Sequence, residues 1–214
     1  MRLYAALIAV VAWAGLAGQY YLITRGTSGP VFLFRTVNFF SYFTILSNIF
    51  VALVTTATAI VPRSAIGRVL MRPGVAAGAL LYVAITGLIY FLVLRHLWQP
   101  QGLQFWVDAI QHYAVPILFL GFWLFGVIKG RLTVDVVPKL LVFPLLFAGY
   151  TLIRGPFAGW YPYPFIDAGE LGYGTVAANI VFLVAGFGVL GFLIVGIDRL
   201  IARLRNAAPP PPGV

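Results

Sequence analysis

The stretch GVAAGALLYVAITGLIYFLVL, residues 74–94, contains no charged side chain. At a rise of about 1.5 Å per residue, a helix of this length crosses about 30 Å, which is the thickness of the hydrocarbon core of a bilayer. A soluble helix of similar length carries charged residues on its exposed face, and this stretch has none. Residues 74–94 therefore predict a membrane-spanning helix.

Apolar runs of this kind recur along the chain, separated by short segments that hold the charged residues and many of the glycines and prolines. Hydrophobic residues make up 62% of the sequence and charged residues only 9%, and a soluble domain of 214 residues cannot bury so much apolar surface. The sequence predicts six spanning helices, at residues 3–24, 37–61, 74–94, 107–128, 137–153 and 174–197.

The first run is longer than the apolar region of a secretory signal, so we expect it to stay in the protein as a helix. The predicted fold is thus an all-α, six-helix integral membrane bundle over residues 1–205, in a multi-pass protein of the cell membrane. Residues 206–214 are rich in proline and are predicted to form a disordered cytoplasmic tail.

Lys and Arg residues are distributed unevenly between the two ends of the predicted bundle. Ten of the 14 lie in the N-terminal flank, the second and fourth connections and the C-terminal segment. Because cytoplasmic segments are rich in Lys and Arg, both termini are predicted to be cytoplasmic. The net charge of +9 is explained by this topology and by contact with anionic membrane lipids, and no nucleic-acid partner is expected.

Two helices place a reactive polar side chain a few residues inside an apolar run. Thr44 lies in FFSYFTILSNIF, residues 39–50, and His112 lies in DAIQHYAVPILF, residues 108–119. With the termini inside, both fall roughly 8–11 Å below the outer hydrocarbon boundary. A hydroxyl and an imidazole are costly at this depth and supply a nucleophile and a base, so they predict a hydrolytic site.

Further polar residues share the helix faces or the depth of this pair. Helical spacing puts Ser47 and Asn48 on the face of the threonine and Asp108 on the face of the histidine, while Asn179 falls in the same layer of the sixth helix. These side chains predict a small wet pocket open to the outer leaflet. The amide of Asn48 or Asn179 is a candidate to stabilise an oxyanion there.

Two other residues are expected to shape this pocket. Pro116 has no N–H to donate to the carbonyl of His112, so a kink is expected at that point. Arg154, at the outer end of the fifth helix, is predicted either to bind a substrate carboxylate through its planar guanidinium or to anchor at lipid headgroups.

Structural interpretations exist for all of these residues. Ser and Thr in membrane helices often bond to the carbonyl four residues earlier, Asn and His often join two helices, and aromatic residues such as Tyr163 often form interfacial belts. No metal is expected, because a zinc hydrolase needs about three ligands and the chain has two histidines. Haem ligation by His96 and His112 would need matching depths, which the spans do not predict, so no cofactor is expected.

Three motifs carry a resemblance to a known family: YFTILSN at 42–48, QHYAVPILF at 111–119 and WYPYPFID at 160–167. In order and spacing, the chain resembles the androgen-induced protein/ADTRP-like family of six-span membrane proteins, in its bacterial branch. This resemblance implies a threonine hydrolase of fatty acid esters of hydroxy fatty acids. It implies Thr44 as the nucleophile, His112 as the second essential residue and a lipid ester as substrate.

The chain departs from the family's pattern in the first motif. Animal members have an acidic residue three positions after the threonine, where this chain has Ser47. Asp108 or Asp167 is then the expected partner that orients the base. Bacterial membranes offer different esters, so the substrate of the animal enzymes is not assigned to this chain.

A second class of function stays open from the sequence, namely a non-catalytic lipid-binding protein or a small transporter. Helices rich in small residues and the internal Pro116 and Pro144 are compatible with it. A proton-coupled transporter is less favoured, because none of the five acidic residues is predicted deep within a helix. The sequence does not indicate an oligomeric state.

Overall fold

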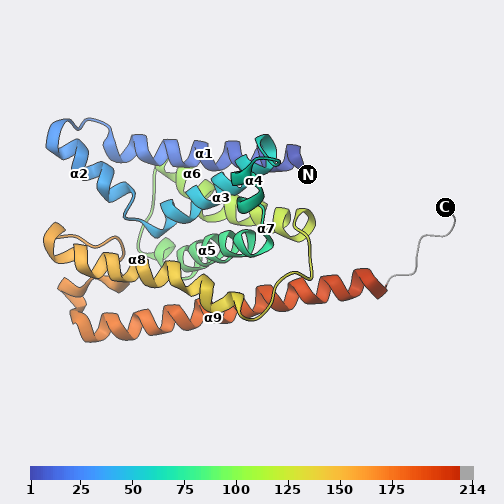
Figure 1. The fold of residues 1–214 in the computed structure, drawn as a ribbon. Coiled ribbons are helices and arrows are strands. Elements are labelled where there is room, and N and C mark those ends of the chain that lie inside the picture. The colour runs from blue at the N-terminus through green and yellow to red at the C-terminus, as the bar shows by residue number, and fades with distance from the viewer. Residues whose placement is uncertain (208–214) are drawn as a thin grey trace.

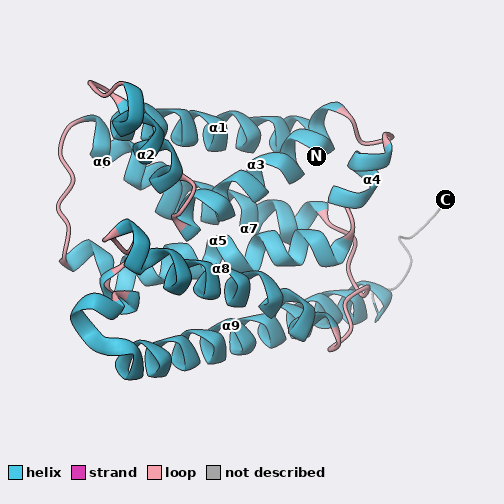
Figure 2. Ribbon diagram, turned by 60° about the vertical axis from the view of Figure 1, so that its left-hand side comes forward, coloured by secondary structure: helices cyan, strands magenta, loops and turns pink. Residues whose placement is uncertain are grey.

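The computed structural model describes residues 1–207, and over that range the chain consists of helices and loops (Figure 2). Six of the helical segments are long and apolar enough to cross a membrane, which confirms the all-α class and agrees with a multi-pass membrane protein. The helices are α1 (Arg2–Thr24), α2 (Gly29–Phe39), α3 (Phe43–Ile60), α4 (Ala65–Leu70), α5 (Pro73–Leu92), α6 (Leu103–Ala109), α7 (Val115–Gly126), α8 (Val136–Ala158) and α9 (Ala168–Ala207).

Short turns connect some of these helices. A π-helical turn, Ile110–Ala114, joins α6 to α7 into one continuous span, and 3₁₀ turns lie at Leu94–His96 and Pro164–Ile166. Helix α9 continues through residue 207. The remainder of the predicted proline-rich tail lies outside the described residues.

Helices α3 and α5 form the centre of the bundle (Figure 1). Helix α1 packs on α3, α7 packs on α5, and α8 and α9 pack against each other. Helix α1 buries small residues at helical spacing, among them Ala5, Ala9, Ala12 and Gly15. Because lipid tails are as apolar as leucine, close packing of such small residues is a main source of association between spans.

The predicted helix 37–61 is two helices in the structure. Helix α2 ends at Phe39, and α3 begins at Phe43 after a tight turn in which the Ser41 hydroxyl donates to the Val37 carbonyl at 2.7 Å. Thr44 is therefore the second residue of α3 instead of a residue two turns inside a helix. Its backbone N–H belongs to the first helical turn, where no intrahelical acceptor exists.

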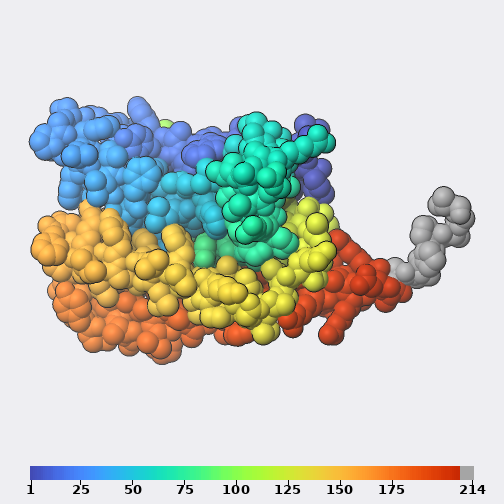
Figure 3. Space-filling model, in the orientation of Figure 1, coloured from blue at the N-terminus to red at the C-terminus, as the bar shows by residue number. Residues whose placement is uncertain are grey.

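Helix α2 lies on the surface at the end of the bundle away from the N-terminus, next to α8 (Figure 3). It exposes a row of apolar side chains that includes Phe32, Leu33, Phe34 and Val37. The hydrocarbon of a membrane, or its interface, is a suitable environment for such a surface. The short helix therefore adds apolar surface beside the α3 start, where Thr44 lies.

The last span differs from its prediction at both ends. Helix α9 starts at Ala168 and includes Gly172 in a left-handed conformation with φ 73°, which bends its first turn away from the rest. Near its other end, Asp198 Oδ2 accepts hydrogen bonds from the backbone N–H groups of Gly130 and Leu132 at 2.9 and 3.1 Å. Asp198 thereby ties the connection between α7 and α8 to α9.

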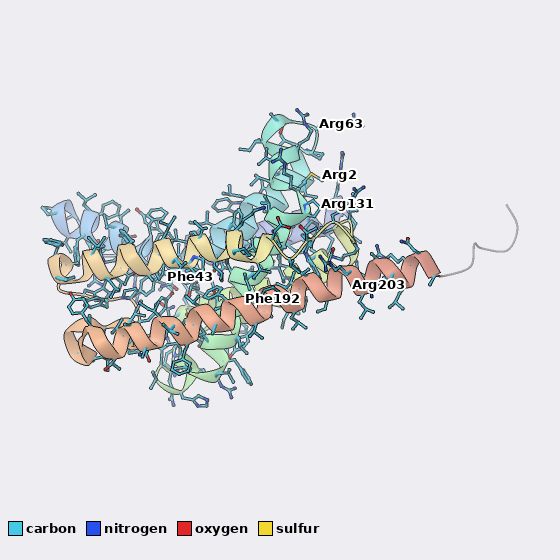
Figure 4. The ribbon with its side chains drawn as sticks, turned by 60° about the horizontal axis from the view of Figure 1, so that its bottom comes forward. Arg2, Phe43, Arg63, Arg131, Phe192 and Arg203 are labelled. Carbon is cyan, nitrogen blue, oxygen red and sulfur yellow. The ribbon has the colours of Figure 1, made fainter. Side chains whose placement is uncertain are left out.

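Basic residues gather at the end of the bundle that holds residue 1 and the end of α9. Arg2, Arg63, Arg131 and Arg203 all lie toward this end (Figure 4). The connection between α5 and α6 and the connection between α8 and α9 lie at the opposite end (Figure 1). The charge distribution predicts that the basic end faces the cytoplasm, and this sidedness stays a prediction.

Candidate active site

Thr44 and His112 meet inside the bundle. The distance between Thr44 Oγ1 and His112 Nε2 is 3.5 Å, although the residues lie 68 positions apart in the chain. Their side chains are only 7% and 8% exposed, respectively. The first turn of α3 and the π-helical turn between α6 and α7 thus bring a hydroxyl and an imidazole into hydrogen-bond contact.

The hydrogen bonds of His112 determine which ring nitrogen carries the proton. Nδ1 lies 3.0 Å from the backbone carbonyl oxygen of Asp108, which can only accept, so Nδ1 is the protonated nitrogen of the neutral ring. Nε2 then presents its lone pair to Thr44 Oγ1. The ring is also stacked on Tyr90, with centroids 4.0 Å apart and planes at 15°. This is the arrangement that a general base needs.

The π-helical turn explains how this ring is aimed. Where the sequence predicts a kink before Pro116, the structure has this wider turn, Ile110–Ala114. Turns of this kind are often found at functional sites, because they shift side chains out of the regular helical register. Helix α5 supports the turn through Gly87, where an added Cβ would lie only 2.7 Å from the carbonyl oxygen of His112.

Tyr163, from the connection between α8 and α9, completes the contacts of the threonine. Its hydroxyl accepts from the backbone N–H of Thr44 at 3.1 Å and lies 3.2 Å from Thr44 Oγ1. Burial raises the pKa of Tyr163 to about 12, so this hydroxyl keeps its proton at neutral pH. Because Thr44 donates to His112, Tyr163 must donate to Thr44. The sequence predicts no role for Tyr163 at this site, and the motif WYPYPFID is the only signal that contains it.

Ser47 and Asn48 lie next to the pair but donate to backbone oxygens. Ser47 Oγ donates to the Thr44 carbonyl at 3.0 Å, and Asn48 Nδ2 donates to the same carbonyl at 2.8 Å. Asn48 Nδ2 also lies 3.4 Å from the carbonyl of Gln111. Both side chains therefore fix the start of α3, and Asn48 joins it to the π-helical turn. Neither directs a free donor at the threonine hydroxyl.

The carboxylate of Asp108 makes no hydrogen bond to His112, which instead binds the main-chain oxygen of Asp108. The carboxylate accepts hydrogen bonds from Trp98 Nε1 at 2.9 Å, from Gln104 Nε2 at 3.1 Å and from the Tyr90 hydroxyl at 3.5 Å. Asp108 and Asp198 are 7% and 1% exposed, and both lie within spanning segments.

Three other predicted residues make contacts away from Thr44. Asp167 Oδ1 accepts from the backbone N–H groups of residues 169 and 170 at 2.9 and 3.1 Å and so caps the start of α9. Asn179 Nδ2 donates to the carbonyl of Phe165 at 2.8 Å. Arg154 donates to Asn38 Oδ1. Asp167 and Asn179 thereby hold the loop that carries Tyr163.

Two cavities meet at Thr44. The wide cavity, about 430 Å³, includes Gln19, Tyr42, Trp98, Gln104, Asp108 and His112 in its lining. The narrow cavity, about 70 Å³, is lined mostly by apolar side chains of α3, α5, α8 and α9, among them Phe43, Ile85, Phe147 and Phe187. Thr44, Leu94 and Tyr163 line both. The threonine hydroxyl thus lies at the junction of a polar and an apolar space.

Comparisons of the chain with known protein families, with curated proteins and with solved structures find no match. The resemblance carried by the three motifs therefore stays an expectation. The geometry of Thr44, His112 and the cavities is the basis for the function proposed below.

Proposed function

We propose that this chain is an integral membrane ester hydrolase in which Thr44 is the nucleophile and His112 is the base. The observation that carries the proposal is the buried contact of 3.5 Å between the Thr44 hydroxyl and His112 Nε2, with the other ring nitrogen held by a main-chain oxygen. The contact is slightly long, as is common in sites without substrate. The junction of two cavities at the hydroxyl gives a substrate room on both sides.

The reaction proceeds in two halves. Thr44 Oγ1 attacks the ester carbonyl carbon while His112 Nε2 accepts the hydroxyl proton. The bond between the carbonyl carbon and the alkoxy oxygen then breaks, and His112 returns the proton to the departing alcohol. A water molecule attacks the acyl-threonine, again with proton transfer through His112, and releases the acid and the free threonine.

The negative charge on the carbonyl oxygen needs donors, and the start of α3 supplies them. The N–H groups of the first helical turn have no intrahelical acceptor, and the helix dipole favours negative charge there. Tyr163 adds a protonated hydroxyl at the same place. These groups replace Asn48 and Asn179 as proposed oxyanion donors, because both amides donate to carbonyl oxygens and neither residue lines a cavity at Thr44.

The proposed substrate is a lipid ester. The narrow cavity, with its phenylalanine and isoleucine lining, suits the first carbons of an acyl chain, and the wide cavity suits a polar alcohol part. The resemblance of the three motifs also implies a lipid ester. Because the site lies in a spanning bundle, the ester is proposed to arrive from the surrounding lipid.

The nucleophile is tested by labelling the purified protein in detergent with a fluorophosphonate and mapping the label by mass spectrometry. We expect the wild-type protein to be labelled on Thr44 and the Thr44→Ala variant to be unlabelled. Thr55→Ala is the matched control, because Thr55 is a buried hydroxyl of the same helix that donates to the Val51 carbonyl and lines neither cavity. It should label as the wild type does. Well-folded wild-type protein that takes no label would refute the proposal.

The Tyr163→Phe variant is expected to lower kcat/KM about 10- to 100-fold, because it removes one hydroxyl that binds both Thr44 Oγ1 and the Thr44 N–H. The ring stays, so the loop should keep its packing. Tyr161→Phe, in the same loop but outside the lining of either cavity, is the control and should retain kcat/KM. Equal kinetics in the two variants would show that Tyr163 only packs.

A further inference from the structure

The wide cavity carries one formal charge, and that charge is negative. Among the residues that line it in the described chain, Asp108 is the only Asp, Glu, Lys or Arg. Its two carboxylate oxygens accept from three donors, Trp98, Gln104 and Tyr90, which is the pattern of an ionised carboxylate. All three donors are uncharged groups, so none of them neutralises the carboxylate at the wall of the cavity.

The arginines at this end of the bundle do not neutralise that charge. Arg25, Arg35 and Arg95 are exposed, where salt screens them, and none of the three lines the wide cavity. Arg154 donates to Asn38 and lies with its guanidinium carbon 5.5 Å from the centre of the Trp160 ring. A carboxylate of a substrate would therefore enter a space whose described lining holds a like charge and no Lys or Arg.

We propose that the wide cavity selects esters whose alcohol part carries a positive charge, such as a quaternary ammonium group, over esters whose alcohol part carries a carboxylate. This inference rests on the proposed ester hydrolysis and names the substrate class of the same site. A cation in the cavity gains Coulomb attraction to Asp108, and the attraction is stronger there than in water because of the lower dielectric constant. Tyr42 and Trp98, which also line the cavity, offer aromatic rings that attract such cations.

The orientation of the ester follows from the two cavities. The apolar lining of the narrow cavity favours the start of the acyl chain there, which places the alcohol part in the wide cavity on the side of His112 and Asp108. This preference differs from the substrate class implied by the motif resemblance, in which the alcohol part is a hydroxy fatty acid with a free carboxylate. The expected role of Arg154 as carboxylate ligand has no support here, because Arg154 lines neither cavity.

Three esters with the same acyl chain test the preference: palmitoylcholine, 1-palmitoylglycerol and the palmitoyl ester of glycolic acid. Their alcohol parts are cationic, neutral and anionic. We expect kcat/KM in nonionic detergent micelles to fall in that order, with about a tenfold or larger difference between the cationic and anionic esters. A nonionic micelle has no surface charge, so the charge of the detergent does not affect the order of the three kcat/KM values. An anionic ester hydrolysed as well as the cationic one, or better, would overturn the inference.

A charge introduced at the cavity provides a matched pair of variants. Leu97 lines the wide cavity and is 67% exposed, so polar replacements are tolerated there. Leu97→Lys should lower the ratio of kcat/KM for the cationic ester to kcat/KM for the anionic ester about tenfold. Leu97→Gln adds no charge and should keep the wild-type ranking of the esters. Asp108→Asn should move the ratio in the same direction as the lysine.

The experiment separates the two levels of the proposal. If the fluorophosphonate labels Thr44 but kcat/KM does not depend on the charge of the alcohol part in any variant, only the charge selectivity is refuted. If none of the esters is hydrolysed and Thr44 takes no label, the hydrolase and its selectivity are both refuted.

Discussion

Replacement of His112 by Ala is expected to lower kcat/KM for a hydrolysed ester about 10³-fold or more, and to abolish phosphonate labelling of Thr44. The Thr44 hydroxyl is a weak nucleophile unless its proton is removed as it attacks. The structure offers one acceptor placed for this, His112 Nε2, at 3.5 Å. Because Nδ1–H is bound to the Asp108 carbonyl, the ring has the protonation state that the reaction needs before substrate arrives.

The rival interpretation is that His112 is a packing residue, and two comparisons separate it from a base. His112→Gln keeps a polar side chain of similar size but has no basic nitrogen, so it should be inactive while its thermal unfolding midpoint in detergent stays near that of wild type. His96→Ala is the control, since His96 is exposed and lines neither cavity at Thr44. Full turnover by folded His112→Ala protein would exclude the base.

The six spans were predictable because hydropathy depends only on which residues are present. The pairing of Thr44 with His112 was predictable because polar side chains are costly in apolar segments and tend to contact one another. The depths predicted from helical rise were not the reason, because both helices start at other residues than predicted. The break between α2 and α3 was missed because the apolar run continues through it without a charge or a proline. Membrane insertion explains why residues 37–61 are mostly apolar and carry no charge, and the helix ends at the turn in which the Ser41 hydroxyl donates to the Val37 carbonyl.

The partners of the pair were less predictable, because they depend on main-chain atoms and loop placement. A spacing of four residues put Asp108 beside His112, but spacing does not say whether the carboxylate or the carbonyl makes the contact. Tyr163 reaches Thr44 only because Asp167 caps α9 and Asn179 holds the carbonyl of Phe165, which fixes the loop over the start of α3. Those contacts are long-range consequences of the fold and have no periodic signal in the sequence.

Gly87→Ala is expected to cost stability and activity together, although residue 87 touches neither Thr44 nor the imidazole of His112 in any hydrogen bond. A Cβ built on Gly87 would lie 2.7 Å from the backbone oxygen of His112 and 3.3 Å from Pro116 Cγ. Neither neighbour yields easily: the first is main chain, and the second is a ring inside the helix. Helix α5 must therefore move away from the π-helical turn, and such overpacking costs about 1–3 kcal/mol.

This displacement of α5 should also slow the reaction, because the π-helical turn positions His112 Nε2 against the Thr44 hydroxyl. A misplacement of catalytic groups by about 1 Å can cost about 10²-fold in rate, so kcat should fall about 10- to 100-fold in Gly87→Ala. Gly149→Ala is the matched control: Gly149 also lies within a spanning helix, but an added Cβ there meets nothing within 4 Å. It should keep the wild-type kcat and the wild-type unfolding midpoint. Unchanged kcat in a destabilised Gly87→Ala protein would mean that α5 supports the fold without positioning the base.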